Sequence, residues 1–162
     1  METIIIGMGN PLLTDDSVGI KVARILGEKL RAKKDVVARE FCVGGMRLME
    51  ELIGYRRAII IDAMVSGCHE PGAVCNLQLS ELAATRNTFS THDASLADAL
   101  DLGKLLGLPL PEEVKIWAIE AGDVATYSDS LTEKVQAAVP KVVSDVILHL
   151  NADSSLPQQE TR

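Results

Sequence analysis

The sequence lacks the features that mark several common classes of protein. Its 16 Lys and Arg face 23 Asp and Glu, and the net charge of −7 has the wrong sign for holding nucleic acid or an anionic membrane surface. Cys42, Cys68 and Cys75 are an odd number without the spacing of a disulfide framework or a zinc knuckle. No apolar run approaches the ~20 residues of a membrane span, and the first run has no basic flank like that of a signal peptide. We therefore expect a cytoplasmic protein with reduced thiols and with no nucleic-acid or membrane partner.

The chain does have enough apolar residues for one sizeable core. Its 162 residues are 47% hydrophobic and 24% charged, a composition that needs neither disulfides nor a structural metal. At roughly 150 residues per domain this length favours a single unit, and no repeat or low-complexity linker divides it. We expect one α/β domain over residues 1–150 and a polar, disordered tail over residues 151–162.

Short apolar runs alternate with stretches of helical spacing along the chain. The runs predict strands over residues 3–8, 35–42, 57–62 and 114–119, with an edge strand over 73–79. The helical spacing predicts helices over residues 16–30, 46–53, 96–106 and 131–150, with a brief one near 80–82. Pro140 is expected to kink or split the last helix. This alternation predicts a three-layer α/β/α sandwich.

Polar residues follow several of the predicted strands, at the sheet edge where open α/β sheets bind ligands. They are the turn over residues 7–16, Asp62, the junction over residues 91–93, Glu120 and Asp123. If these loops meet over the sheet, Asp16, Asp62 and His92 present two carboxylates and one imidazole to a common point. Such a set suits zinc, nickel or cobalt, with positions left for water or substrate.

Each of these residues also has a purely structural interpretation. Asp15 and Asp16 are good N-cap residues for the helix that follows, and one of the pair could cap while the other binds metal. Asp62 could bond the amides of the next two residues, although a carboxylate after four apolar strand residues faces burial and needs a cation or several donors. His92 could be a solvated residue at a helix start, where a lowered pKa would keep its imidazole neutral.

Four further ionisable residues are expected to be ordinary surface groups. His69 lies in a loop with irregular spacing to other metal-binding residue types, and His149 lies on the last predicted helix. Glu120 and Asp123 could contact a substrate from the end of the last strand, but solvation is the simpler expectation for both.

A dinucleotide-binding fold is the main alternative from the glycine pattern. Gly7 and Gly9 follow the first strand as in the dinucleotide fingerprint, but Leu12 occupies the place of the third glycine. Two aspartates then put negative charge where a pyrophosphate would bind, and Glu40 is a weak substitute for the ribose-binding acid. A nicotinamide or flavin oxidoreductase is therefore the weaker hypothesis. The sequence motifs of serine hydrolases and of zincin metalloproteases are absent too.

Three motifs resemble those of a known family. IGMGNPLLTDDSVG over residues 6–19 resembles the opening motif of the [NiFe]-hydrogenase maturation proteases, and residues 61–63 and 91–93 resemble their second and third signatures. The resemblance covers residues 3 to 150. It implies a mixed, mostly parallel five-stranded sheet with one antiparallel strand, and a metal bound by Asp16, Asp62 and His92. Many relatives have Glu at the position of Asp16.

The resemblance also implies an activity and a partner. The expected function is an endopeptidase that removes the C-terminal extension of a hydrogenase large-subunit precursor after nickel insertion, with the nickel supplied by that subunit. Asp16, Asp62 and His92 would engage the nickel beside the scissile bond, where the metal promotes hydrolysis. Alternatively, Asp16 and Asp62 would share a proton and activate water without metal catalysis. A nickel-dependent checkpoint protein that binds the subunit without cutting it would use the same ligands.

Overall fold

The computed structural model of the chain describes residues 2–42, 45–79 and 91–153, and for residues 91–95 and 153 it describes the backbone alone. In chain order its elements are β1 (Thr3–Met8), the 3₁₀ turn η1 (Asp15–Ser17), α1 (Val18–Lys29), β2 (Val36–Phe41), α2 (Met46–Leu52), β3 (Arg57–Met64), β4 (Val74–Gln78), α4 (Thr91–Leu105), β5 (Glu113–Glu120) and α5 (Glu133–Asp153). Within these ranges no helix has the length and hydropathy that a membrane span requires.

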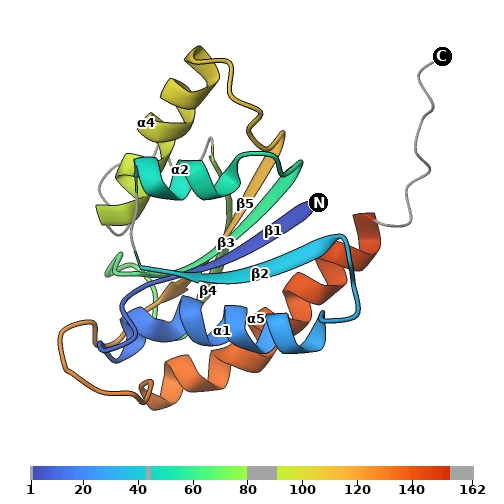
Figure 1. Cartoon of the computed structure of the whole chain (residues 1–162). Helices are drawn as coiled ribbons and strands as arrows, with labels where there is room; N and C mark the ends of the chain where they lie inside the picture. The colour runs from blue at the N-terminus through green and yellow to red at the C-terminus, as the bar shows by residue number, and fades with distance from the viewer. Residues whose placement is uncertain (1, 43–44, 80–90, 154–162) are drawn as a thin grey trace.

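Five strands form one sheet in the order β2-β1-β3-β5-β4. Strands β1, β2, β3 and β5 run parallel, whereas β4 lies antiparallel to β5 at one edge. Helices α1 and α5 cover one face of the sheet, and α2 and α4 cover the other (Figure 1). The predicted three-layer α/β/α sandwich with a mixed, mostly parallel five-stranded sheet is therefore confirmed.

The inner strands are apolar on both faces because helices cover both. All six residues of β1 are buried, and its isoleucines point alternately to the two layers. Ile4 and Ile6 pack in the cluster beneath α2 and α4, whereas Ile5 packs in the cluster beneath α1 and α5. The two clusters hold the sheet from both sides and fix the loops at its carboxyl edge.

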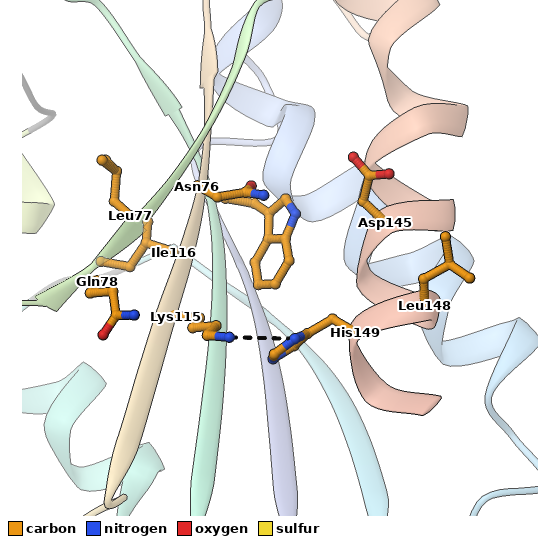
Figure 2. Close-up of a pocket in the computed structure, with 9 residues that line it drawn as sticks. Asn76, Leu77, Gln78, Lys115, Ile116, Asp145, Leu148 and His149 are labelled. Carbon is orange, nitrogen blue, oxygen red and sulfur yellow. Dashed lines mark hydrogen bonds between the residues drawn. The ribbon is translucent and has the colours of Figure 1, made fainter. Parts of the chain in front are cut away.

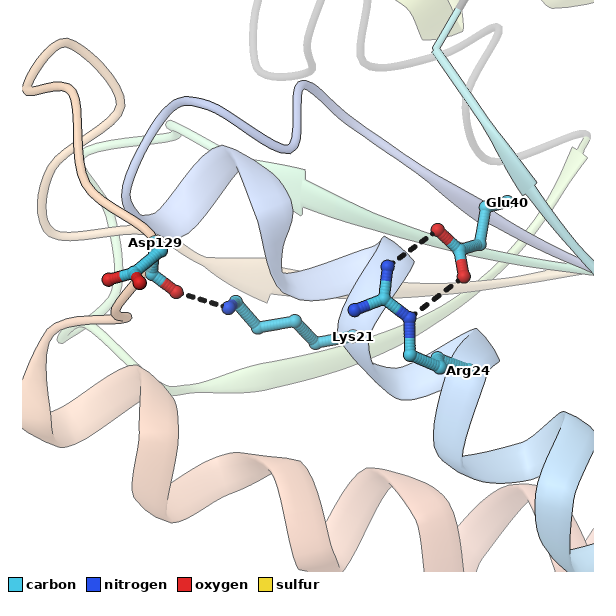
Figure 3. A network of polar contacts seen from close by, with 4 residues as sticks. All are labelled: Lys21, Arg24, Glu40 and Asp129. Atoms are coloured by element: carbon cyan, nitrogen blue, oxygen red, sulfur yellow. Dashed lines mark hydrogen bonds and ion pairs between the residues drawn. The ribbon is translucent and has the colours of Figure 1, made fainter.

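Helix α1 is also joined to its surroundings by charged side chains (Figure 3). Arg24 of α1 donates from Nε and from a terminal nitrogen to the two carboxylate oxygens of Glu40 in β2, at 2.9 and 2.8 Å. Lys21, one turn earlier, donates to the backbone oxygen of Asp129, in the segment before α5. The helix is thus held to β2 on one side and to a distant loop on the other.

Strand β3 is longer than its sequence pattern suggests. The prediction ended the strand at Asp62, whereas pairing with β5 continues through Met64, which lies opposite Glu120. Asp62 therefore lies inside the strand, opposite Ala118. The prediction ended at Asp62 because a charged residue interrupts the apolar run there. The length of the strand is instead set by its pairing with the neighbouring strand β5. The brief helix predicted near residues 80–82 lies outside the described residues.

Helix α5 runs without a break through Pro140, so of the kink or split expected at this proline the split is wrong. Pro140 cannot donate to the carbonyl of Gln136, but both residues are exposed, where water can bond that carbonyl. Val135 and Val139 are buried on the inner side of the helix and anchor it. The helix continues to Asp153, past the predicted domain end at residue 150, and the rest of the tail lies outside the described residues.

Candidate active site at the carboxyl edge of the sheet

The turn between β1 and α1 packs closely against the ends of two strands. Gly9 has a φ of 137°, and a Cβ at this position would lie 1.7 Å from the backbone oxygen of Asp16. A Cβ at Gly19 would lie 2.2 Å from the backbone oxygen of Ile61 in β3. Glycine is therefore required at both positions. This close approach sets the acidic turn η1 in contact with β3.

Asp16 lies in η1 and is half-buried. Its Oδ2 accepts the backbone N–H of Asn10 at 2.7 Å, which fixes the carboxylate within the turn. Over the residues that the structure describes, its Oδ1 accepts no hydrogen bond. A carboxylate held by one oxygen with the other open is suited to binding a cation or activating water.

Asp62 lies on β3 with 1% of its surface exposed. Its Oδ1 accepts the backbone N–H of Ala63 at 2.8 Å, as the structural interpretation of this residue predicted. Its strand contacts η1, so the structure brings the element that carries Asp16 next to the strand that carries Asp62. A carboxyl group buried at this edge lies where desolvation makes electrostatic interactions strong.

His92 is the second residue of α4, and its side chain lies outside the described residues. The first turn of α4 lies at the end of the sheet where β1 runs into η1 (Figure 1). Where side chains are described, no group of three His, Cys, Asp or Glu is placed to hold a metal ion. The ligand set of Asp16, Asp62 and His92 therefore stays a prediction.

Asp15 has a role that sequence reasoning missed. Its side chain is fully buried, and its Oδ2 accepts the backbone N–H groups of Gly122 and Asp123 at 2.8 and 2.9 Å. It accepts two more hydrogen bonds from Thr132. The expected capping role is wrong, because neither η1 nor α1 has a side-chain cap. Asp15 instead anchors the segment after β5 to the acidic turn.

The two acids near the end of β5 are structural rather than simply solvated. Glu120 is buried and accepts hydrogen bonds from the N–H groups of Ser66 and Gly67 at 3.0 Å and from the Ser66 hydroxyl at 2.6 Å. Hydrogen bonds from Thr126 and then Ala125 hold the pKa of Asp123 below its ordinary value. The expectation of solvation is therefore wrong for Glu120, because the loop after β3 closes over it.

The other histidines differ from each other. His69 is exposed, as expected. His149 is half-buried, and its ring lies 5.5 Å from that of Trp117, so its interpretation as a surface residue is wrong. The signal was its spacing, because His149 follows the buried Val146 by three positions and precedes the buried Leu150.

Large apolar side chains are exposed around this edge. Leu12 is 63% exposed and Tyr127 is 80% exposed. Their segments are tied together, since the N–H of Ser128 donates to the Leu12 carbonyl at 3.1 Å. Met46, at the start of α2, and Val65, after β3, are also exposed. We call Leu12, Met46, Val65 and Tyr127 the apolar rim, and large apolar side chains exposed beside a site are typical of a surface that contacts another molecule.

The chain belongs to the hydrogenase maturation protease family, a class of endopeptidases, because a family model of that description matches its residues 20–149. It is 26% identical to the hydrogenase 2 maturation protease of Escherichia coli strain K12 over 151 residues, which are 93% of this chain and 91% of that protein. The family resemblance inferred from the three motifs is thereby confirmed.

Solved structures agree with this assignment. The hydrogenase maturating endopeptidase HybD from E. coli matches with a TM-score of 0.80 and 25% identity, over 99% of this chain and 100% of that one. A [NiFe] hydrogenase maturation protease HybD from Thermococcus kodakarensis matches with a TM-score of 0.71 and 29% identity, over 91% of this chain and 98% of that one. These matches support the interpretation of the protein as an endopeptidase over the alternative of an oxidoreductase.

Proposed function

We propose that this endopeptidase removes the C-terminal extension from the precursor of a [NiFe]-hydrogenase large subunit after nickel has been inserted. The observation that carries the proposal is the half-open carboxylate of Asp16 on a turn packed against the strand of the buried Asp62. Membership of the family supports it, as does the similarity to a protein named as a hydrogenase 2 maturation protease.

In this proposal nickel belongs to the substrate. Asp16, Asp62 and His92 engage the nickel that the precursor carries, and so report that the subunit is loaded. Two carboxylates and one imidazole suit this ion. The open Oδ1 of Asp16 supplies one ligand atom, and the buried Asp62 gains a cation that offsets its desolvation. His92 joins them from the first turn of α4.

The chemistry is hydrolysis of one peptide bond. The oxygen of water adds to the scissile carbonyl carbon, the C–N bond then breaks, and the departing amine takes a proton. In one route, the nickel of the substrate polarises the carbonyl or activates the water. In the other, Asp16 and Asp62 share a proton, so that the ionised carboxylate takes a proton from water and a carboxyl returns one to the amine.

The apolar rim supports a polypeptide as the substrate. Leu12 and Tyr127 are exposed on segments that Asp15 and the Ser128 hydrogen bond fix in place, so they present a preformed apolar surface beside Asp16. A small polar substrate would gain nothing from this surface. An extended chain end with apolar side chains would bury it.

The test is the intact mass of a large-subunit precursor, loaded with nickel or left without it, before and after incubation with the protein. We expect a short C-terminal peptide to be lost from the nickel-loaded precursor only. Asp62→Asn should abolish this loss, whereas Asp98→Asn, an exposed acid on α4, should not. Both variants should have the melting temperature of the wild type. A lack of cleavage by Asp62→Asn could then not be explained by unfolding of the protein.

The outcomes separate the alternatives. Cleavage of the nickel-free precursor at the same rate would show that the carboxylate pair suffices without the metal. If the protein formed a nickel-dependent complex with the precursor without any cleavage, it would be a checkpoint protein and not a protease. Unchanged processing by Asp62→Asn would remove Asp62 from the site.

A further inference from the structure

A short antiparallel pairing lies beside the acidic turn, where the loop between β5 and α5 meets the segment after β1 (Figure 1). Leu13 and Tyr127 face each other there as an isolated β-bridge. Two backbone hydrogen bonds flank the bridge, from the N–H of Thr14 to the carbonyl of Thr126 at 3.0 Å and from the N–H of Ser128 to the carbonyl of Leu12 at 3.1 Å. We call residues 126–128 the bridge segment.

The backbone of Tyr127 points away from this pairing. In an antiparallel pair that is flanked by its hydrogen bonds, the two facing residues direct their own N–H and C=O to the outer edges. Among the residues that the structure describes, none bonds to the N–H or the C=O of Tyr127. The outer edge of the bridge segment therefore offers one donor and one acceptor, the groups by which a further strand is added.

The bridge segment is held in place before any ligand binds. The Thr14 hydroxyl donates to the carbonyl of Thr126 at 2.7 Å. Oδ1 of Asp123 accepts the N–H groups of Ala125 and Thr126 at 2.9 and 3.0 Å, and the N–H of Asp123 donates to Asp15. A preformed segment loses less conformational entropy on binding than a free loop does.

The position of this edge beside Asp16 indicates which chain would add to it. Leu13, opposite Tyr127, precedes Asp16 by three positions, and neighbouring strands lie about 4.8 Å apart. A chain on the outer edge therefore runs within roughly 20 Å of Asp16, a distance that about six extended residues cover. This reach suits the short chain end that the proposed protease removes.

We propose that Tyr127 is a strand-pairing position for the C-terminal extension of the precursor, an inference that rests on the proposed function. One residue of the extension accepts a hydrogen bond from the N–H of Tyr127 and donates one to its carbonyl. Leu12 and Tyr127, whose side chains are exposed on the two paired segments, contact apolar side chains of the extension. The paired residue of the extension cannot be proline, because proline has no N–H to donate.

Two substitutions at one position separate the backbone from the side chain. Tyr127→Ser removes the ring and keeps the N–H, whereas Tyr127→Pro removes both. We expect KM for the nickel-loaded precursor to be about fivefold higher for Tyr127→Pro than for Tyr127→Ser, with kcat equal within about twofold. Two folded variants with the same KM would overturn the proposal.

An ester at residue 127 gives the same test if proline disturbs the fold. The α-hydroxy analogue of tyrosine replaces the N–H of this residue by an oxygen and keeps the ring. We expect it to raise KM about fivefold over the wild type with little change in kcat. An unchanged KM would overturn the proposal. A fall in kcat alone would also overturn it, since a pairing that only binds the extension acts on KM.

Leu148→Ser is the control, because Leu148 is an exposed leucine far from this edge. It lies on α5 and lines the pocket between β4 and α5 (Figure 2), which shares no residue with the bridge segment or the acidic turn. KM should equal that of the wild type. Failure of the proposed function looks different, since the wild type would then leave the precursor uncut, and both proposals would fall. Failure of strand pairing alone leaves processing by the wild type intact.

Discussion

Both carboxylate oxygens of Asp15 bind Thr132, Oδ1 through its backbone N–H and Oδ2 through its hydroxyl, each at 2.8 Å. Oδ2 also accepts the N–H groups of Gly122 and Asp123. The turn after β1 and the segment between β5 and α5 therefore form one unit. Asp16, the next residue, is held in place by the anchoring of its neighbour.

Replacing Asp15 tests this anchor. Asp15→Asn turns one acceptor oxygen into a donor that faces N–H groups, and it removes the charge from four partly buried hydrogen bonds. We expect the free energy of unfolding to fall by about 2–4 kcal/mol, measured by urea denaturation. Asp98→Asn, on the exposed surface of α4, should change it by less than about 0.5 kcal/mol. Equal stability of the two variants would contradict the anchoring role.

Asp16 should be needed for activity and not for stability. Asp16→Asn keeps an acceptor for the N–H of Asn10 but loses the charged oxygen that faces the site, so we expect no processing of the precursor by a protein that still folds. Asp16→Glu keeps the charge and should retain processing. Intact-mass assays on both variants check this. Loss of activity in the Glu variant alone would show that the site requires the side-chain length of Asp16 and not its charge.

The apolar rim should act on substrate binding. We expect Leu12→Ser and Tyr127→Ser to raise KM for the precursor several-fold with little change in kcat, because each removes roughly 1–2 kcal/mol of apolar contact. Their stability should match that of the wild type, since both side chains are exposed in the free protein. Leu105→Ser removes another exposed leucine, at the end of α4, and serves as the control. A matching rise in KM for Leu105→Ser would contradict a specific role of the rim.

The Arg24–Glu40 pair should make a small, pH-dependent contribution to stability. The hydrogen bond from Arg24, and then its charge, lower the pKa of Glu40 from its ordinary value. A carboxylate with a lowered folded pKa stabilises the fold above its ordinary pKa, and this stabilisation is lost as the pH falls through the folded value.

Because the pair is exposed, we expect Glu40→Gln to cost about 0.5 kcal/mol at pH 7 and progressively less below about pH 4. Urea denaturation of both proteins across this range measures the difference. The same cost at pH 7 and at low pH would show that packing, and not the ion pair, is responsible.

The layers of the fold follow from local patterns, because a run such as Ile4, Ile5 and Ile6 is stable only between two helical layers. The antiparallel direction of β4 had no signal of that kind and came from the family resemblance. The length of β3 was missed because pairing with β5 continues past Asp62, and no local pattern reports the extent of a neighbouring strand.

The position of the candidate site was predictable from the sequence. Which of the two aspartates, Asp15 or Asp16, is structural and which is open to the site was not. Asp15 and Asp16 are neighbours of the same type, and what distinguishes them is that Thr132 and Gly122 lie beside one and not the other. Those partners are more than a hundred positions away in the sequence. Glu120 was misjudged for the same reason, because the loop at Ser66 that buries it is distant in sequence. Tertiary contacts of this range leave no trace in a local pattern.

The bonds between Asp15 and Thr132 span 117 positions, and this separation sets an order of events during synthesis. When Asp15 leaves the ribosome, the groups that will neutralise its burial have not yet been translated. The acidic turn therefore reaches its final form only after the segment that precedes α5 has emerged and docked. Until that segment has docked, the turn between β1 and α1 lacks the hydrogen bonds that fix it, so the proposed site is assembled only after the chain has been translated beyond Thr132.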